Sequence, residues 1–240
     1  MNIQSNMDFV FENENQGTAS SFGTTAKPYD NLQDVNMYFA KFPKLEFRKD
    51  QMIYLVNSSS DNVYFVESGS VVTGNLSDTG EVVINVLLFR GQLFGEQALM
   101  GTPRRNEFAQ AKEKTILREV PAVALRNELK SSGMLSLAVN QLILQKMYQI
   151  QEKWRSQIVD YARTRVIDFI LFLTDNNSRK VGLEYTVDNF FPHREIASII
   201  GSSRQTVTVT LNELRTKNLI YFDRKRLIVR DREQLVKERF

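Results

Sequence analysis

A group of side chains between residues 203 and 212 combines the chemical groups that read base pairs in duplex DNA. Arg204 can donate two hydrogen bonds to O6 and N7 of guanine, and the amide of Gln205 can pair with adenine. The methyl groups of Thr208 and Val209 can contact the methyl of thymine. Hydroxyls and backbone amides at a helix start can bind phosphates. The predicted DNA-contacting residues of this segment are Ser203, Arg204, Gln205, Thr206, Thr208 and Val209.

Two short helices must position this group. The segment 194–200 has a helical spacing that turns its isoleucines inward, and Gly201 allows a tight turn after it. Ser202 followed by Gln205 has the spacing of a capping box, so we expect the second helix to begin at Ser202. The apolar stripe that should bury this second helix consists of Val207, Leu211 and Leu214.

A basic hairpin follows the second helix. Residues 219–230 read as two short strands with Arg224, Lys225 and Arg226 at the tip, and Lys225 is the predicted backbone-phosphate contact. Residues 162–240 carry 15 Lys and Arg against 10 Asp and Glu, whereas the preceding 161 residues carry 16 against 18. A helix-turn-helix can also be a plain packing unit with a polar exterior, but the basic hairpin favours DNA. We predict a winged helix-turn-helix domain over 163–240.

The N-terminal half differs in composition and in the spacing of its apolar residues. Residues 1–28 are rich in Asn, Gln, Ser, Thr and Gly and predict a flexible tail. Apolar residues at helical spacing between Leu32 and Phe42 predict a short helix that ends near Pro43. Short β-rich runs broken by turn residues fill 45–120, which is typical of a sandwich, roll or small barrel. We therefore expect a β-rich domain over 29–130.

One long helix is predicted between these two domains. The stretch 135–161 has no Gly or Pro, and its apolar residues recur at spacings of three and four. Such a stripe can face the protein core, but a long helix between two domains with polar remaining faces favours the seam of a parallel homodimer. We assign 131–162 to this dimerisation helix, with an interface formed by Ile143, Met147, Ile150, Trp154 and Ile158.

Composition excludes several classes of chemistry. Cysteine is absent and there is one histidine, so thiolate zinc sites, iron–sulfur clusters and disulfides are excluded and we expect no metal site. Asp160, Asp168, His193 and Glu195 have no spacing that suggests acid–base catalysis, and we expect no enzyme activity. The chain has neither a membrane-spanning apolar run nor a secretion signal, which predicts a cytoplasmic protein without membrane contact.

The order of these parts resembles the cyclic AMP receptor protein and fumarate-nitrate regulator superfamily of bacterial transcription factors. The motifs "VYFVESGSV", "LFGEQALMG" and "REIASIIGSSRQTV" carry the resemblance, which covers residues 30–235. It implies an α+β fold: an N-terminal β-roll of the cyclic-nucleotide-binding, double-stranded β-helix type, a long dimerisation helix and a C-terminal winged helix-turn-helix. It also implies a homodimer on palindromic double-stranded DNA with half-sites roughly 34 Å apart. RNA polymerase would be a further partner if the protein is an activator.

The resemblance also implies an effector site in the β-roll. The family pattern places a Gly-Glu pair about ten residues before an Arg-Ser or Arg-Thr pair, and this chain has Gly95, Glu96, Arg105 and Asn106 at those positions. Arg105 would neutralise a cyclic phosphate, and Glu96 would accept a hydrogen bond from a ribose hydroxyl. Ile150 stands where the cyclic AMP receptor protein has a threonine that contacts adenine, and Gln151 follows it. The alternatives are cyclic AMP or another cyclic nucleotide, another small ligand, or a roll that binds no ligand.

A second function remains open at this point. The protein could be a non-catalytic, ligand-binding regulatory module whose basic C-terminal domain contacts protein or RNA instead of duplex DNA. The predicted reading helix and basic hairpin favour duplex DNA. The target sequence does not transfer from the family, because Gln205 stands where the cyclic AMP receptor protein has a base-reading glutamate and Val209 where it has an arginine.

Overall fold

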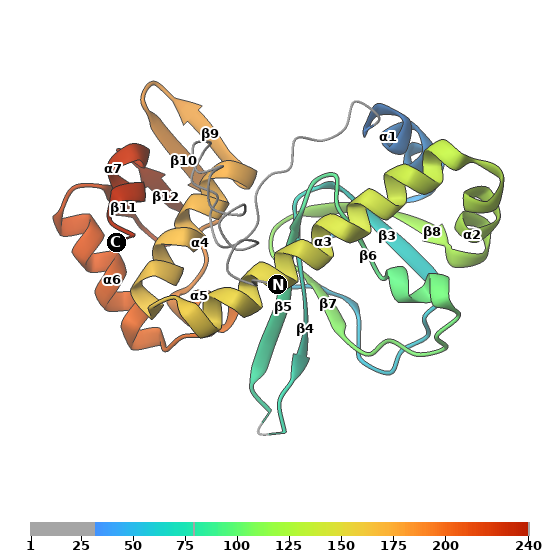
Figure 1. Ribbon diagram of the computed structural model, residues 1–240, viewed down its shortest axis with the longest axis horizontal. Coiled ribbons are helices and arrows are strands. Elements are labelled where there is room, and N and C mark those ends of the chain that lie inside the picture. The colour runs from blue at the N-terminus through green and yellow to red at the C-terminus, as the bar shows by residue number, and fades with distance from the viewer. Residues whose placement is uncertain (1–31, 79, 240) are drawn as a thin grey trace, which may run out of the picture.

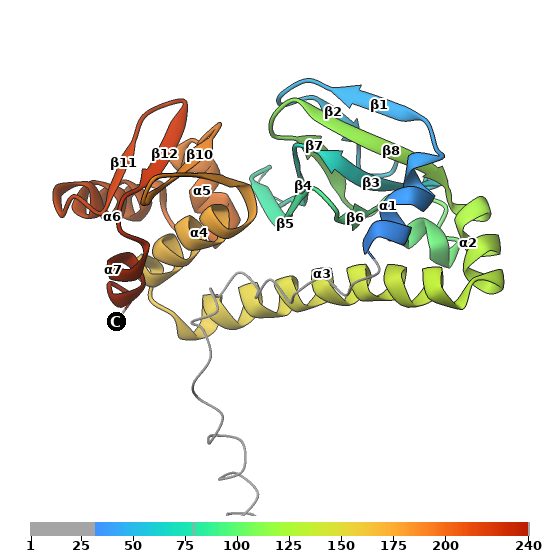
Figure 2. The same cartoon turned by 90° about the horizontal axis from the view of Figure 1, so that it is seen from above.

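The computed structural model describes residues 32–78 and 80–239. The predicted tail over 1–28 lies outside these described residues. The chain forms a β-rich lobe and a mixed lobe of helices and short strands, and one long helix runs past both (Figure 1; Figure 2). This arrangement confirms the predicted α+β architecture.

The β-rich lobe is a roll of two four-stranded antiparallel sheets. The strand orders are β1-β8-β3-β6 and β2-β7-β4-β5. Alternating side chains from both sheets meet in an interior that includes Val66, Val71, Leu88 and Leu117, all fully buried. The strands are β1 (Lys44–Phe47), β2 (Met52–Tyr54), β3 (Asn62–Ser68), β4 (Ser70–Leu76), β5 (Val82–Phe89), β6 (Leu93–Phe94), β7 (Phe108–Ala111) and β8 (Thr115–Pro121).

Helix α1 (Leu32–Ala40) forms where the apolar spacing predicted a short helix, and it closes one end of the roll. Val35 and Phe39 are buried, and the ring of Phe39 stacks on Phe65 with centroids 4.5 Å apart. A short 3₁₀ helix (Glu96–Met100) lies between β6 and β7 and interrupts the strand pattern.

The long helix α3 spans Gly133–Val159 and follows α2 (Ala122–Ser131). It begins earlier than the predicted Leu135 because the hydroxyl of Ser132 accepts a hydrogen bond from the Leu135 amide and caps the first turn. It ends before the predicted Tyr161, since Asp160 and Tyr161 have extended backbones. Helix α3 lies straight along one side of both lobes (Figure 2).

The C-terminal lobe packs four helices with a four-stranded sheet of order β11-β12-β10-β9. Residues 178–181 form β9 and pair with β10 around the turn at Gly182, where φ is +63°. The sequence "SRKV" is polar and mostly exposed, so it lacks the alternation that marks a strand. The elements are α4 (Ala162–Asn177), β9 (Ser178–Val181), β10 (Glu184–Asp188), α5 (His193–Ile200), α6 (Arg204–Thr216), β11 (Ile220–Phe222), β12 (Arg226–Val229) and α7 (Arg232–Lys237).

A single buried apolar cluster continues from the roll into the C-terminal lobe. The rings of Phe89 on β5 and Phe172 on α4 lie 5.6 Å apart, and the residues 166–174 of α4 are buried. Within the described residues, none of the helices has the length and apolar character needed to cross a membrane. The same part of the chain holds no cluster of side chains suited to a metal ion.

Candidate functional site

The α5–turn–α6 unit has a largely apolar inner face. Ile196, Ile199 and Ile200 of α5 are buried, and Val207, Leu211 and Leu214 of α6 are 0% exposed, as predicted. Gly201 ends α5 in the left-handed region at φ +64°, which favours glycine. This packing fixes α6 on the lobe and leaves its opposite face toward solvent.

The predicted start of α6 was wrong by one residue. The Ser202 amide donates to the Ala197 carbonyl (2.9 Å) and so closes the C-terminus of α5. Ser203 therefore caps α6, with an extended backbone and a hydroxyl that accepts from the Thr206 amide (3.0 Å). Ser202 and Gln205 do not form a capping box. The hydroxyls of Ser203 and Thr206 also lie within 2.9 Å of each other.

The outer face of α6 presents the predicted base-reading groups unequally. Arg204, Gln205 and Val209 are exposed, with Val209 at 59%. Thr208 is half-buried, and its hydroxyl donates to the Arg204 carbonyl (2.9 Å) and lies 2.9 Å from Nδ1 of His193. Burial and the positive charge of Arg204 lower the pKa of His193, which favours a neutral imidazole beside the helix. The methyl of Thr208 remains for apolar contact.

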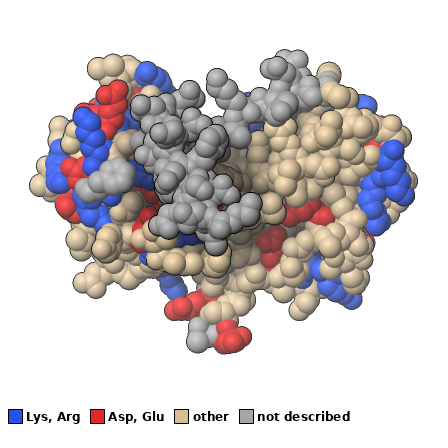
Figure 3. All heavy atoms as spheres, in the orientation of Figure 1, with Lys and Arg blue, Asp and Glu red and all other residues tan. Residues whose placement is uncertain are grey.

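The basic hairpin is the turn between β11 and β12. The carboxylate of Asp223 accepts from the amides of Lys225 (2.7 Å) and Arg226 (3.0 Å), and these bonds lower the pKa of Asp223. The side chains of Arg224, Lys225 and Arg226 are exposed. On the face seen in Figure 3, the C-terminal lobe carries cationic and anionic side chains intermixed. The hairpin tip is thus a local group of three exposed cationic side chains.

The residues predicted for an effector site do not lie together and fall in three places. Glu96, Asn106 and Ile150 line a cleft of about 390 Å³ between the roll and α3. Arg105 is only 2% exposed and does not line this cleft, and neither does Gly95. Gln151 is exposed elsewhere on α3.

Arg105 is occupied by the roll itself. Its guanidinium donates to the carbonyls of Gly95 (3.0 Å) and Asn62, and it lies 4.4 Å from the centre of the Tyr54 ring. Burial raises the pKa of Tyr64, the second ring beside the guanidinium, to about 12. Arg105 therefore joins two segments of the roll through carbonyls and aromatic faces.

The sequence analysis did not identify three ionisable residues that line this cleft, which are Glu107, Lys146 and Lys153. Lys146 of α3 is buried and donates to both carboxylate oxygens of Glu96 (2.9 and 3.1 Å), with Glu107 at 3.9 Å. Lys153, two helical turns later, donates to the carbonyls of Ile84 and Asn85, and burial lowers its pKa to about 8. The sequence did indicate that Lys146 would be buried, because it follows Leu135, Val139 and Leu142 at helical spacing on the same face of the helix.

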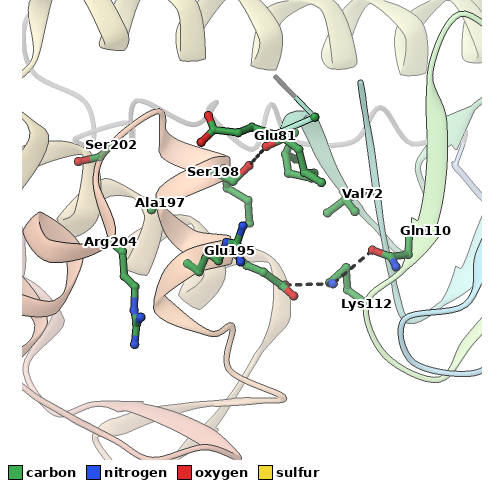
Figure 4. A pocket seen from close by; sticks show the side chains of 14 residues that line it. Val72, Glu81, Gln110, Lys112, Glu195, Ala197, Ser198, Ser202 and Arg204 are labelled. Atoms are coloured by element: carbon green, nitrogen blue, oxygen red, sulfur yellow. Dashed lines mark hydrogen bonds and ion pairs between the residues drawn. The ribbon is translucent and has the colours of Figure 1, made fainter. Parts of the chain in front are cut away.

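A second cleft, of about 470 Å³, lies between the roll and the helix-turn-helix (Figure 4). Lys112 reaches across the domain boundary to Glu195 (3.0 Å), and Ser198 of α5 donates to the Val82 carbonyl of β5. Arg204 lines the same cleft. The roll is therefore in direct polar contact with the domain that carries α6.

Comparisons with known proteins agree with this geometry. The family described as cyclic nucleotide-binding domain matches residues 44–132, and the family described as Crp-like helix-turn-helix domain matches residues 164–238. The chain is 25% identical over 185 residues to the global nitrogen regulator of Nostoc sp., covering 76% of this chain and 83% of that protein. It is 27% identical over 195 residues to the transcriptional regulator LdrP of Thermus thermophilus, covering 80% and 94%.

The fold is shared with a solved structure. FixK2 from Bradyrhizobium japonicum superposes with a TM-score of 0.71 at 21% identity, over 82% of this chain and 96% of that one. The two matched families follow each other along the chain: the cyclic nucleotide-binding domain comes first and the Crp-like helix-turn-helix domain second. The chain belongs to the cyclic AMP receptor protein and fumarate-nitrate regulator superfamily of transcription regulators.

Proposed function

We propose that two copies of the chain pair through α3 and bind a palindromic DNA site, with each α6 in the major groove of one half-site. The observation that carries this proposal is the two-faced character of α6. Its inner stripe is 0% exposed, whereas Arg204, Gln205 and Val209 project from the opposite side. A polar outer face on a rigidly packed helix, beside a cationic hairpin, is the arrangement that base reading requires.

Each predicted contact has a proposed role. Arg204 pairs with guanine, Gln205 pairs with adenine, and Val209 and the methyl of Thr208 contact thymine. Because the Thr208 hydroxyl already bonds within the protein, it acts through its methyl alone. Ser203 and Thr206, together with the helix N-terminus, hold a phosphate, and Lys225 contacts the backbone from the hairpin.

The dimer interface is proposed from the outward face of α3. Met147, Ile150, Trp154 and Ile158 are all exposed, with Trp154 at 67%. An apolar row of this kind along a helix is typical of a coiled-coil seam. Ile143 is different: it is half-buried and packs against the core shared by the roll and α3, so its contribution to pairing is smaller.

We assign one proposed role to each of three segments of the chain. Residues 29–130 form the effector-type roll, 131–162 the dimerisation helix and 163–240 the DNA-binding domain. The alternative, a basic domain that contacts protein or RNA, has no specific support in the geometry. A single exposed helix beside a cationic hairpin matches the width of the major groove of duplex DNA, whereas A-form RNA has a major groove too narrow for side chains to read.

We further infer that an effector would bind in the cleft beside α3 and that Arg105 serves the fold instead of holding a cyclic phosphate. The guanidinium would have to leave two carbonyls and an aromatic face to reach the cleft. Glu96 would have to leave Lys146. Calorimetric titration with cyclic AMP and cyclic GMP should give no saturable binding. Binding that is lost in Arg105→Met would contradict this inference.

The experiment that tests the main proposal is selection of bound sequences from a pool of random duplex DNA, using the full chain. We expect an enriched palindrome with half-sites centred roughly 34 Å apart. Sequencing that returns no enriched motif, or a motif without two-fold symmetry, would overturn the proposal. Adding cyclic AMP or cyclic GMP to parallel selections should leave the enriched motif and its recovery unchanged.

A further inference from the structure

The guanidinium of Arg165 lies where α3, α4 and α5 meet. Nη1 donates to the carbonyl of Asp160 (2.6 Å), Nε to that of Ile200 (3.1 Å), and Nη2 to that of Gly201 (3.0 Å). Asp160 is the C-cap of α3, Ile200 is the last residue of α5, and Gly201 is the C-cap of α5. One side chain of α4 therefore caps the C-termini of two other helices.

This contact suits an arginine for a physical reason. The last carbonyls of a helix have no partner within the helix and carry partial negative charge, so a cation near them is stabilising. A guanidinium is planar and presents donors on two edges, which lets it bond to two separate elements at a fixed angle. The ammonium of a lysine is a single point and could not span the carbonyls of both α3 and α5.

The surrounding residues leave little freedom for another arrangement. Only Asp160 and Tyr161 separate α3 from α4. On the last turn of α3, the Gln157 amide packs against Gly201, where a Cβ atom would collide with it. Ser203, the cap of α6, follows Gly201 by two residues. The beginning of α6, the helix proposed to read the DNA, is thus tied to the end of α3 through Arg165.

We propose that Arg165 is a positioning residue that fixes the direction of α6 relative to α3, and through it the separation of the two recognition helices in the dimer. This inference rests on the proposed function, since spacing has meaning only for a dimer on a two-part site. In such a dimer α3 supplies the axis of pairing, so the angle between α3 and the α5–α6 turn sets the distance between the two reading faces. Loss of the guanidinium should leave each reading face intact and loosen their separation.

The test compares three kinds of duplex by fluorescence anisotropy: the selected palindrome, the same palindrome lengthened or shortened by a few base pairs at its centre, and a single half-site. For the wild type, joining two half-sites at the right spacing should strengthen binding by about 10²-fold or more, and altered spacing should remove most of that gain. In Arg165→Met the half-site affinity should stay within about twofold, while the gain falls to about tenfold and becomes insensitive to spacing.

Arg163→Met is the matched control. Arg163 lies on the same helix and carries the same charge, but its guanidinium bonds to Glu238 and to Glu213 near the C-terminal end of α6, instead of to the ends of α3 and α5. This variant should keep the spacing preference of the wild type. Arg165→Lys serves as the second test variant, because it retains a cation at the helix ends without the two-edged geometry. It should lose spacing discrimination as Arg165→Met does.

The outcomes separate the two proposals. A wild-type protein that binds all duplexes equally would contradict the proposed function. A wild type with a sharp spacing preference that Arg165→Lys or Arg165→Met fully retains would overturn the positioning role. Equal losses on half-site and palindrome would also overturn it, since they would show that Arg165 merely supports the domain. Should Arg165→Met fail to fold by circular dichroism, Arg165→Lys decides alone.

Discussion

The ammonium of Lys112 lies 3.0 Å from the carboxylate of Glu195 and 2.8 Å from that of Asp50, and it thereby joins the roll to the first turn of α5. Lys112 is only 7% exposed, although both acids are open to solvent. The lysine is therefore the buried member of a three-charge bridge across the domain boundary. Its removal leaves two carboxylates facing each other without a cation between them.

Lys112→Met should lower the free energy of unfolding by about 1 kcal/mol, because a partly buried ion pair is lost while the apolar stem is retained. Urea denaturation measures this. Lys114→Met is the control, since Lys114 is exposed and lies 3.8 Å from an equally exposed Glu46. It should change the free energy by less than about 0.5 kcal/mol. Equal losses in both variants would show that the bridge across the boundary contributes nothing specific.

Arg204→Ala should reduce discrimination at one guanine of each half-site by roughly 1 to 3 kcal/mol, because the proposed bidentate pair with O6 and N7 would be lost. Anisotropy with the selected duplex and with a duplex substituted at that guanine measures the difference. Arg215→Ala is a suitable control, as its guanidinium lies over the Phe222 ring, 5.1 Å from the centroid, and is not part of the reading face. A loss that is equal on specific and random DNA would refute base reading by Arg204.

Lys225→Ala should behave differently, because the contact proposed for Lys225 is with the DNA backbone, and such a contact carries no sequence information. Binding should weaken to a similar degree on all duplexes, and the dependence of log K on log salt should become shallower by about one unit. Titrations at several salt concentrations measure both effects. Arg230→Ala, which removes an exposed cation from beyond the hairpin tip, should leave the slope unchanged. An unaltered slope for Lys225→Ala would remove the hairpin tip from the interface.

The sequence was sufficient to predict what depends on local periodicity. The buried stripe of α6, the inward isoleucines of α5 and the turn at Gly201 follow from spacing within a few residues, and all are observed. The cap of α6 was misplaced because the closing bond of α5 uses the Ser202 amide, and that bond depends on how the preceding helix ends. A motif of four residues does not contain this information.

The effector region could not be predicted to the same degree, because its contacts join distant segments. Arg105 meets Tyr54 and Tyr64, which come from other strands of the roll, and Lys146 meets Glu96 from fifty residues earlier. The family motif identifies Arg105 and Glu96 as residues near the cleft. It does not identify the residues that bond to them, because those residues lie outside the motif. Fold and DNA-binding unit were therefore predictable, whereas the state of the effector residues was not.

Lys153 should make the free energy of unfolding depend on pH between about 8 and 10.5. Burial lowers the pKa of this group from 10.5 to about 8 in the folded protein, so between these values the unfolded chain binds more protons than the folded one. Stability then rises with pH across this interval as the unfavourable buried charge is lost. Relative to Lys153→Met, the wild type should gain roughly 1 to 3 kcal/mol from pH 8 to pH 10.5, measured by denaturation at each pH. The exposed Lys130→Met should show no such trend.

Trp154→Glu should convert the proposed dimer to a monomer. Trp154 lies at the middle of the exposed apolar row of α3, so pairing would bury its ring, and a glutamate there would place two carboxylates in a desolvated seam. Sedimentation velocity across a concentration series measures the shift. Val123→Glu, an equally exposed apolar position on α2, should leave the assembly unchanged. Because the monomer retains α6 and the hairpin, it should still bind a single half-site but lose the gain from the palindrome. A Trp154→Glu protein that sediments as a dimer would place the seam elsewhere on the chain.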